Sequence, residues 1–184
     1  MTPADALTAF HGGRAMLRAG YARLGIAVSE DDISRHYPRL LAAYAEGICV
    51  ATRLYPGVVA AVERLRVAGY ATAICTNKPS ALVQPLLDHL GIGDRFALVL
   101  GGDSLPQRKP SGEPLRHIAG HFAFAPGDCL MVGDSLTDYR AAEDAGMPIA
   151  LVRYGYPRGL DLETAHAVAV IDDLLFVFDL PPLD

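Results

Sequence analysis

From Tyr55 onward, short runs of apolar residues alternate with segments of helical periodicity. The runs are four or five residues long and are bounded by turn residues. Such runs are typical of strands that are buried on both faces of a parallel sheet. The predicted strands are Ala71–Cys75, Ala97–Leu100, Cys129–Val132, Ile149–Val152 and Ala167–Ile171. The pattern predicts an α/β fold with a doubly wound parallel sheet.

Stripes of apolar residues at helical spacing predict helices between these strands, and two of the stripes stop at a glycine, which commonly ends a helix. The stripes are Val58, Val62 and Leu65 before Gly69; Leu82, Val83, Leu86, Leu87 and Leu90 before Gly91; and Leu115, Ile118 and Phe122. A further helix is expected to end at Gly146.

Residues 1–54 have helical patterning and no strand pattern. Ser29 is a predicted helix N-cap because an acidic residue, Asp32, follows three positions later. Pro38 is expected to bend or delay this helix, and an earlier helix is expected to end near Gly25. The pattern therefore predicts a small helical segment over residues 1–54 and an α/β segment over residues 55–184.

Composition narrows the classes of function. The chain has 184 residues, of which 51% are hydrophobic and 20% are charged, as in an ordinary globular protein. Sixteen Lys and Arg against 21 Asp and Glu give a net charge of −5, which lacks the basic excess of nucleic-acid-binding proteins. No apolar run is long enough to span a membrane, and the N-terminus has no secretory signal pattern. We therefore expect a cytoplasmic protein with neither nucleic-acid nor membrane partners, and no pattern indicates an oligomeric state.

The three cysteines are too widely spaced for a Cys-x-x-Cys motif. Their number and spacing predict neither a disulfide framework nor a zinc site. We expect them to be small buried hydrophobic residues in a reducing compartment. They are Cys49, Cys75 and Cys129.

Polar residues with complementary chemistry follow the first three predicted strands. Thr76 and Asn77 follow the first strand, Lys109 comes after the second, and Asp134 and Asp138 follow the third. Ligands of open α/β sheets bind beyond the carboxyl ends of the strands, so these residues are expected to lie near one another. A hydroxyl, a lysine and two carboxylates suit a phosphoryl group that is bound together with a divalent cation.

Each of these residues also has a simpler interpretation. Thr76 can be a turn residue, and Lys109 a solvated loop lysine. Asp134 and Ser135 can cap the following helix, with Asp138 near its N-terminal dipole. Their joint occurrence at successive strand ends favours a site over these separate explanations.

The same residues carry a resemblance to the haloacid dehalogenase superfamily of phosphohydrolases. Thr76, Lys109-Pro110 and the segment 133–138 resemble the second, third and fourth motifs of that superfamily. The phosphoglycolate phosphatase branch is the most similar, through the segments Cys75–Pro79, Gly101–Pro106, Met131–Ser135 and Tyr154–Tyr156. The resemblance implies a Rossmann-like core at 55–184 and part of a small helical cap at 1–54.

The resemblance further implies a Mg²⁺-dependent phosphomonoesterase that works through an aspartyl-phosphate, with 2-phosphoglycolate as the first candidate among small phosphorylated substrates. By position, Thr76 and the Asn77 backbone would bind the phosphoryl group and Lys109 would stabilise its charge. Asp134 would ligate Mg²⁺, and Asp138 would bind its water shell or orient Lys109. Arg14 is a candidate for a substrate carboxylate, although a solvated helix arginine is the simpler interpretation.

The sequence departs from the family pattern in one respect. Family members begin with a strand that ends in Asp-x-Asp-x-Thr, and no Asp-x-Asp occurs in this sequence. Without that strand we expect a gap of about 9–10 Å in the sheet, between the strands that end at Thr76 and Asp134. We expect the chain by itself to be inactive. Either the sequence is a truncated reading of a longer phosphatase, or it is an inactive remnant or binding domain.

A serine esterase of the GDSL type is a second, remote alternative. Gly-Asp-Ser-Leu occurs twice, at Gly102–Leu105 and Gly133–Leu136. Those enzymes need a later Asp-x-x-His to activate the serine, and no aspartate in the sequence has a histidine three residues on.

Overall fold

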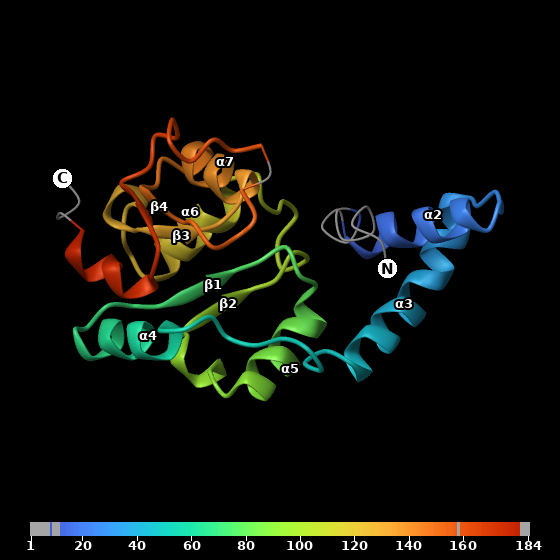
Figure 1. Ribbon diagram of the computed structural model, residues 1–184, viewed down its shortest axis with the longest axis horizontal. Coiled ribbons are helices and arrows are strands. Elements are labelled where there is room, and N and C mark those ends of the chain that lie inside the picture. Colours follow the sequence, from blue (N-terminus) through green and yellow to red (C-terminus); the bar gives the residue numbers. More distant parts are fainter. Residues whose placement is uncertain (1–7, 9–11, 158, 181–184) are drawn as a thin grey trace. The chain divides into compact units, whose positions relative to one another are not determined.

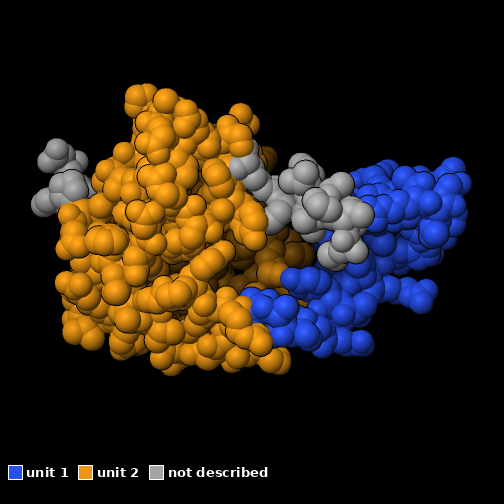
Figure 2. Space-filling view, in the orientation of Figure 1, with its two compact units in different colours: residues 1–52 blue, residues 53–184 orange. Residues whose placement is uncertain are grey.

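The computed structural model describes residues 8, 12–157 and 159–180. The chain divides into two compact units, residues 1–52 and residues 53–184, here called unit 1 and unit 2 (Figure 2). No helix in the described ranges is long and apolar enough to cross a membrane. The three cysteines are free thiols, and each is only partly buried, whereas buried residues were expected.

Within residues 12–52, unit 1 contains two packed helices, α2 (Gly13–Arg23) and α3 (Glu30–Glu46). The predicted cap of α3 is confirmed, because Ser29 Oγ accepts from the Asp32 N–H and the Asp32 side chain accepts from the Ser29 N–H. The expectation that Pro38 delays this helix is wrong, since α3 begins eight residues earlier and continues through it. Ile33, in α3, is fully buried.

The described part of unit 2 contains five short strands, each inside or overlapping a predicted strand, and every pairing between them is parallel (Figure 1). They are β1 (Ala73–Cys75), β2 (Leu98–Leu100), β3 (Met131–Gly133), β4 (Ile149–Val152) and β5 (Ala169–Ile171). The β1 strand pairs with β2, and β4 pairs with both β3 and β5.

The connecting segments contain the predicted helices. They are α4 (Val58–Val67), α5 (Ser80–Leu90), α6 (Glu113–His121) and α7 (Leu136–Ala145), with short 3₁₀ helices η1 (Gly93–Arg95), η2 (Pro126–Asp128) and η3 (Leu174–Asp179). The predicted ends of α5 and α7 are confirmed: Gly91 and Gly146 are left-handed, with φ of 66° and 68°, a conformation that glycine adopts without strain.

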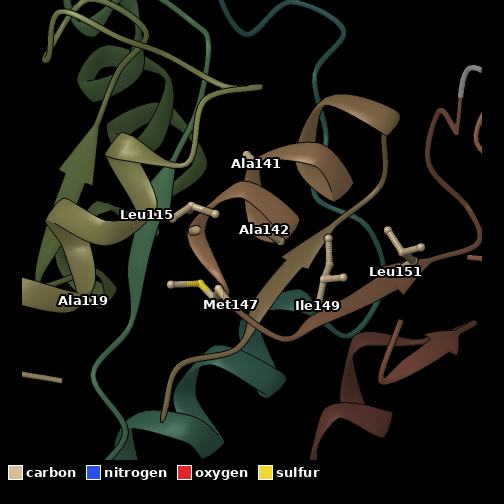
Figure 3. Packing of buried hydrophobic residues seen from close by; sticks show 8 residues of the cluster. Leu115, Ala119, Ala141, Ala142, Met147, Ile149 and Leu151 are labelled. Carbon is tan, nitrogen blue, oxygen red and sulfur yellow. The ribbon is translucent and has the colours of Figure 1, made fainter. Parts of the chain in front are cut away.

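The parallel sheet is in two parts. Among the described residues, β1 pairs only with β2, and β3 only with β4, so neither is paired with the other. Each part has its own hydrophobic core. One core, Val83, Leu87 and Ile92, contacts β1 and β2. The other core joins α6 and α7 to β4 and contains Leu115, Ala119, Ala141, Ala142, Met147, Ile149 and Leu151 (Figure 3). The break falls where the sequence predicted a gap.

Candidate active site

The loop after β1 has an internal hydrogen bond and is also hydrogen-bonded to the segment after β2. The Thr76 N–H donates to Leu100 O at 3.0 Å, and Thr76 Oγ1 accepts from the Lys78 N–H at 3.1 Å. The Asn77 side-chain amide donates to Lys109 O at 2.7 Å. Gly102 lies directly against this loop, since a Cβ there would be 2.4 Å from Asn77 O. Two strand-end loops are therefore packed together as one support.

Lys109 lies at the break in the sheet and is only 8% exposed. Its Nζ donates to Cys75 O and to Asp138 Oδ1, both at 2.6 Å. Consecutive residues of a strand direct their backbone groups to opposite edges, and the Thr76 N–H points to β2. The Cys75 carbonyl therefore points to the unpaired edge of β1. The Lys109 ammonium binds that edge and links it to the first turn of α7.

Asp138 holds Lys109 and caps α7 at the same time. Its Oδ2 accepts from the backbone N–H groups of Asp134 and Ser135 at 3.2 Å, and from Ser135 Oγ at 2.7 Å. Ser135 Oγ in turn accepts from the Asp138 N–H, which completes a capping box. Burial alone would raise the pKa of Asp138, but the charge and hydrogen bond of Lys109, with the Ser135 hydrogen bonds, hold this pKa below its ordinary value.

Asp134 has the opposite electrostatic setting. Burial raises its pKa, and the neighbouring charge of Asp138 adds to this, while a hydrogen bond from the Tyr156 N–H partly offsets both. That bond is 3.0 Å long and reaches Oδ2. Gly155 packs against the same side chain, since a Cβ there would lie 2.1 Å from Asp134 Cβ. The two carboxylates, four residues apart, thus differ in their hydrogen bonds. Both oxygens of Asp138 accept from protein donors, whereas the bond from Tyr156 reaches only Oδ2 of Asp134.

The donor set fits a divalent cation on Asp134. Mg²⁺ is commonly bound by one or two carboxylates together with waters and substrate phosphate oxygens. In the described part of the chain, no three His, Cys, Asp or Glu residues cluster as a complete metal site. Both oxygens of Asp138 already accept hydrogen bonds, so its geometry suits the second predicted role, the orientation of Lys109.

Arg14, the remaining predicted site residue, lies in unit 1. Its guanidinium donates to Ser34 Oγ at 3.1 Å and lies 5.0 Å from the centre of the Tyr37 ring. The other predicted residues, Thr76, Asn77, Lys109, Asp134 and Asp138, all come together at the strand ends of unit 2.

The two serines of the Gly-Asp-Ser-Leu segments bond to no histidine in the described ranges. Ser104 Oγ accepts from the Gly101 N–H at 2.9 Å and contacts Ser80 Oγ at 3.0 Å. Ser135 Oγ is used in the helix cap. Both serines therefore have structural partners and lack the base that an esterase nucleophile requires.

Two cavities of unit 2 lie away from these loops. One, of about 300 Å³, is lined by Tyr70, Thr72 and Arg95 at the amino ends of β1 and β2, among other residues. The other, of about 150 Å³, is lined by Tyr139 and His166, among others. Neither brings together a lysine and carboxylates as the strand-end loops do, so we assign the candidate site to the loops.

Sequence reasoning missed Gly155 and Tyr156 as parts of this site. They follow β4, the fourth predicted strand. Their position after this strand is the signal that could have found them, because ligands bind beyond the carboxyl ends of parallel strands.

Known proteins match most of this chain. The model of the haloacid dehalogenase-like hydrolase family matches residues 10–146. A phosphoglycolate phosphatase of Nitrosococcus oceani is 41% identical over 140 residues, which are 76% of this chain and 62% of that protein. A phosphoglycolate phosphatase of Haemophilus influenzae strain 86-028NP is 38% identical over 149 residues, 81% of this chain and 66% of that protein.

A solved structure has the same fold. It is described as a predicted phosphoglycolate phosphatase from Haemophilus somnus 129pt and superposes with a TM-score of 0.81 at 32% identity, covering 90% of this chain and 74% of that one. The chain thus spans a little under two thirds of the length of the two curated relatives, 62% and 66%. The matches confirm the resemblance seen in the motifs: the chain belongs to the haloacid dehalogenase-like hydrolase family.

Proposed function

We propose that this protein serves as a phosphomonoester hydrolase that requires Mg²⁺ and acts on a small phosphorylated metabolite, with 2-phosphoglycolate as the first substrate to test. The observation that carries the proposal is the position of Lys109. Its buried ammonium is held at an unpaired strand edge, beside Asp138 and next to the loop that carries Thr76. The curated relatives named phosphoglycolate phosphatase support the substrate.

In this proposal the chain's own residues bind and neutralise the phosphoryl group. Lys109 is held by two acceptors, and an ammonium has three donors, so one remains for a phosphoryl oxygen or a carboxylate nucleophile. The Thr76 hydroxyl and the Asn77 N–H bind the remaining phosphoryl oxygens. Because these donors are fixed by protein contacts before substrate arrives, they stabilise transition-state charge with little reorganisation.

Asp134 would hold the cation. When bound, Mg²⁺ supplies positive charge that screens the substrate phosphate from the carboxylates. Asp138 keeps the Lys109 ammonium in place through the 2.6 Å contact. The two carboxylates therefore have separate roles, one toward the cation and one toward the lysine.

The nucleophilic aspartate is not among the 184 residues, which contain no Asp-x-Asp. We infer that it belongs to a strand that would pair with both β1 and β3. The unpaired edges of these strands support this inference. The Lys109 ammonium binds the β1 edge at Cys75 O, so a carboxylate at the end of an added strand would lie next to a fixed positive charge. Unit 1 would form part of the substrate-selecting cap, with Arg14 as a ligand for the substrate carboxylate.

The test is a pair of assays with 2-phosphoglycolate and Mg²⁺. The 184-residue chain alone should release no phosphate. The same chain fused behind a strand segment that ends in Asp-x-Asp-x-Thr should release phosphate, and Lys109→Met in the fusion should remove that activity. Glycerol phosphate, which lacks the carboxylate, serves as the comparison substrate. Turnover by the unfused chain, lost in Asp134→Ala, would refute the inference about the nucleophile.

The alternative is a domain that binds phosphate compounds without turnover, and the absence of Asp-x-Asp favours it for the chain by itself. Saturable binding of 2-phosphoglycolate to the unfused chain, with a fusion that remains inactive, would support this alternative over the hydrolase.

A further inference from the structure

The loop after β4, residues 154–156, contacts Asp134 through its backbone at Gly155 and Tyr156. The Tyr156 N–H donates to Asp134 Oδ2 at 3.0 Å. Gly155 faces the same side chain so closely that an added Cβ would lie 2.1 Å from Asp134 Cβ and 2.5 Å from Oδ2. Real Cβ atoms do not approach other atoms this closely, so a side chain at position 155 would displace Asp134 or the loop.

Space, and not backbone conformation, requires glycine at position 155. The φ of Gly155 is not positive, unlike that of Gly57 or Gly159. An alanine would therefore suit the backbone at this position, because the left-handed region that penalises L-residues is not used. The three atoms nearest to an added methyl group all belong to the Asp134 side chain.

The loop has an anchor of its own. The Tyr154 ring packs on the Tyr55 ring, with 4.5 Å between the ring centres and a tilt of 43°. Tyr55 lies just before α4, and Gly57 beside it packs against Asp173. This ring contact is separate from the hydrogen bond to Asp134, so the loop can hold this carboxylate instead of following its movements.

We propose that Gly155 and Tyr156 are positioning residues for Asp134, fixing one carboxylate oxygen so that the other faces a divalent cation. The inference rests on the proposed function, since the cation belongs to it. A carboxylate held in one rotamer loses less conformational entropy when it binds a cation. Groups that orient a metal ligand typically change metal affinity by about 10–100-fold when they are lost.

The first test needs no cation. Hydrogen exchange of individual amides is compared in the 184-residue protein, in Gly155→Ala and in Gly127→Ala. Gly127 is the matched control, because a Cβ there meets nothing within 4 Å and its φ is not positive. In Gly155→Ala, the hydrogen-exchange rate of the Tyr156 amide should rise about tenfold. The exchange rates of the β4 amides should stay unchanged. Faster exchange along β4 as well, or no change at Tyr156, would overturn the proposal.

A second variant keeps the test decisive if Gly155→Ala fails to fold. Asp134→Ala removes the acceptor without adding atoms, so it should also accelerate exchange at Tyr156 while β4 keeps its protection. Unchanged exchange at Tyr156 in this variant would show that the hydrogen bond to Asp134 does not hold the loop, and would overturn the proposal by itself.

The second test uses Mn²⁺ as a probe for the cation. Binding of Mn²⁺ is measured from the broadening that it causes in the NMR signals of the amides around Asp134. Gly155→Ala should weaken Mn²⁺ binding about tenfold, Gly127→Ala should not change it, and Asp134→Ala should abolish it. Equal Mn²⁺ affinity in Gly155→Ala and the parent protein would overturn the positioning proposal. No saturable broadening in the parent protein would instead refute the cation site of the proposed function, and the exchange results would still decide the role of the loop.

Discussion

Replacing Lys109 with methionine tests the arrangement at the break in the sheet. Methionine keeps much of the side-chain length and removes the charge and both hydrogen bonds. Asp138, only 6% exposed, would then be a buried carboxylate without a cation. The Cys75 carbonyl would also lose its donor.

The expected cost follows from these contacts. Removal of one partner of a buried ion pair typically costs about 3–5 kcal/mol. Asp138 keeps its hydrogen bonds from Asp134 and Ser135, which favours the lower end. We therefore expect Lys109→Met to lower the free energy of unfolding by about 3 kcal/mol, a large part of the roughly 5–15 kcal/mol that holds a typical domain folded.

Urea unfolding followed by circular dichroism measures this loss. With a slope of about 2 kcal/mol per molar urea, the midpoint should fall by about 1.5 M. The double variant Lys109→Met, Asp138→Asn should recover part of the loss, because no uncompensated charge remains. Arg66→Met is the matched control, since the Arg66–Glu63 pair is exposed on α4 and should contribute less than about 1 kcal/mol. A loss in Lys109→Met no larger than in this control would refute the reasoning.

Three further predictions concern Asp138, Ser29 and Leu151. The Lys109 charge and the hydrogen bond from the Ser135 side chain overcome the effect of burial and lower the pKa of Asp138. The ionised Asp138 carboxylate therefore stabilises the fold fully above its unfolded pKa of about 3.9. This stabilisation is lost as the pH falls through the lower pKa of the folded state. The difference in unfolding free energy between the parent and Asp138→Asn should therefore shrink below about pH 4, and a pH-independent difference would contradict this. Ser29→Ala removes the cap of α3 and should cost about 1 kcal/mol in urea unfolding of unit 1, with Ser111→Ala as a control outside that unit. Leu151→Ala should cost about 2–5 kcal/mol, since Leu151 is fully buried in the core of Figure 3, and a loss below about 1 kcal/mol would show that this core repacks.

Local patterns predicted the elements well because each depends on a few neighbouring residues. The Ser29 cap, the glycine ends of α5 and α7 and the order of the five strands all follow from such short-range rules. Pro38 does not delay α3, because proline removes one hydrogen bond without preventing helix on both sides. The strands are mostly shorter than their apolar runs, since hydrogen-bond pairing with a neighbour, and not apolarity, decides where a strand begins.

The candidate site shows where sequence reasoning reaches its limit. Position after a strand sufficed to group Thr76, Lys109 and Asp134, because parallel strands end at one edge. The role of Asp138, toward the water shell of Mg²⁺ or toward Lys109, was left open, since it depends on which donors each of its oxygens meets in three dimensions. Position after β4 is enough to make Gly155 a candidate, but its close contact with Asp134 is not predictable, because it arises from the packing of the loop after β4 on the loop after β3.

Asp138 combines a helix cap with an ion pair to Lys109. The capping box places its Oδ2 on backbone donors at the start of α7, and this fixes the side chain so that Oδ1 meets Lys109. The cap thus supplies the rigidity that the lysine contact requires, because a carboxylate with one oxygen bound has few other rotamers available. Ser135→Ala should therefore do more than weaken the helix cap: it should also loosen Asp138 and, through it, the Lys109 ammonium. If Ser135→Ala and Lys109→Met are combined, their losses in unfolding free energy should not add, whereas strictly additive losses would show that cap and ion pair act independently.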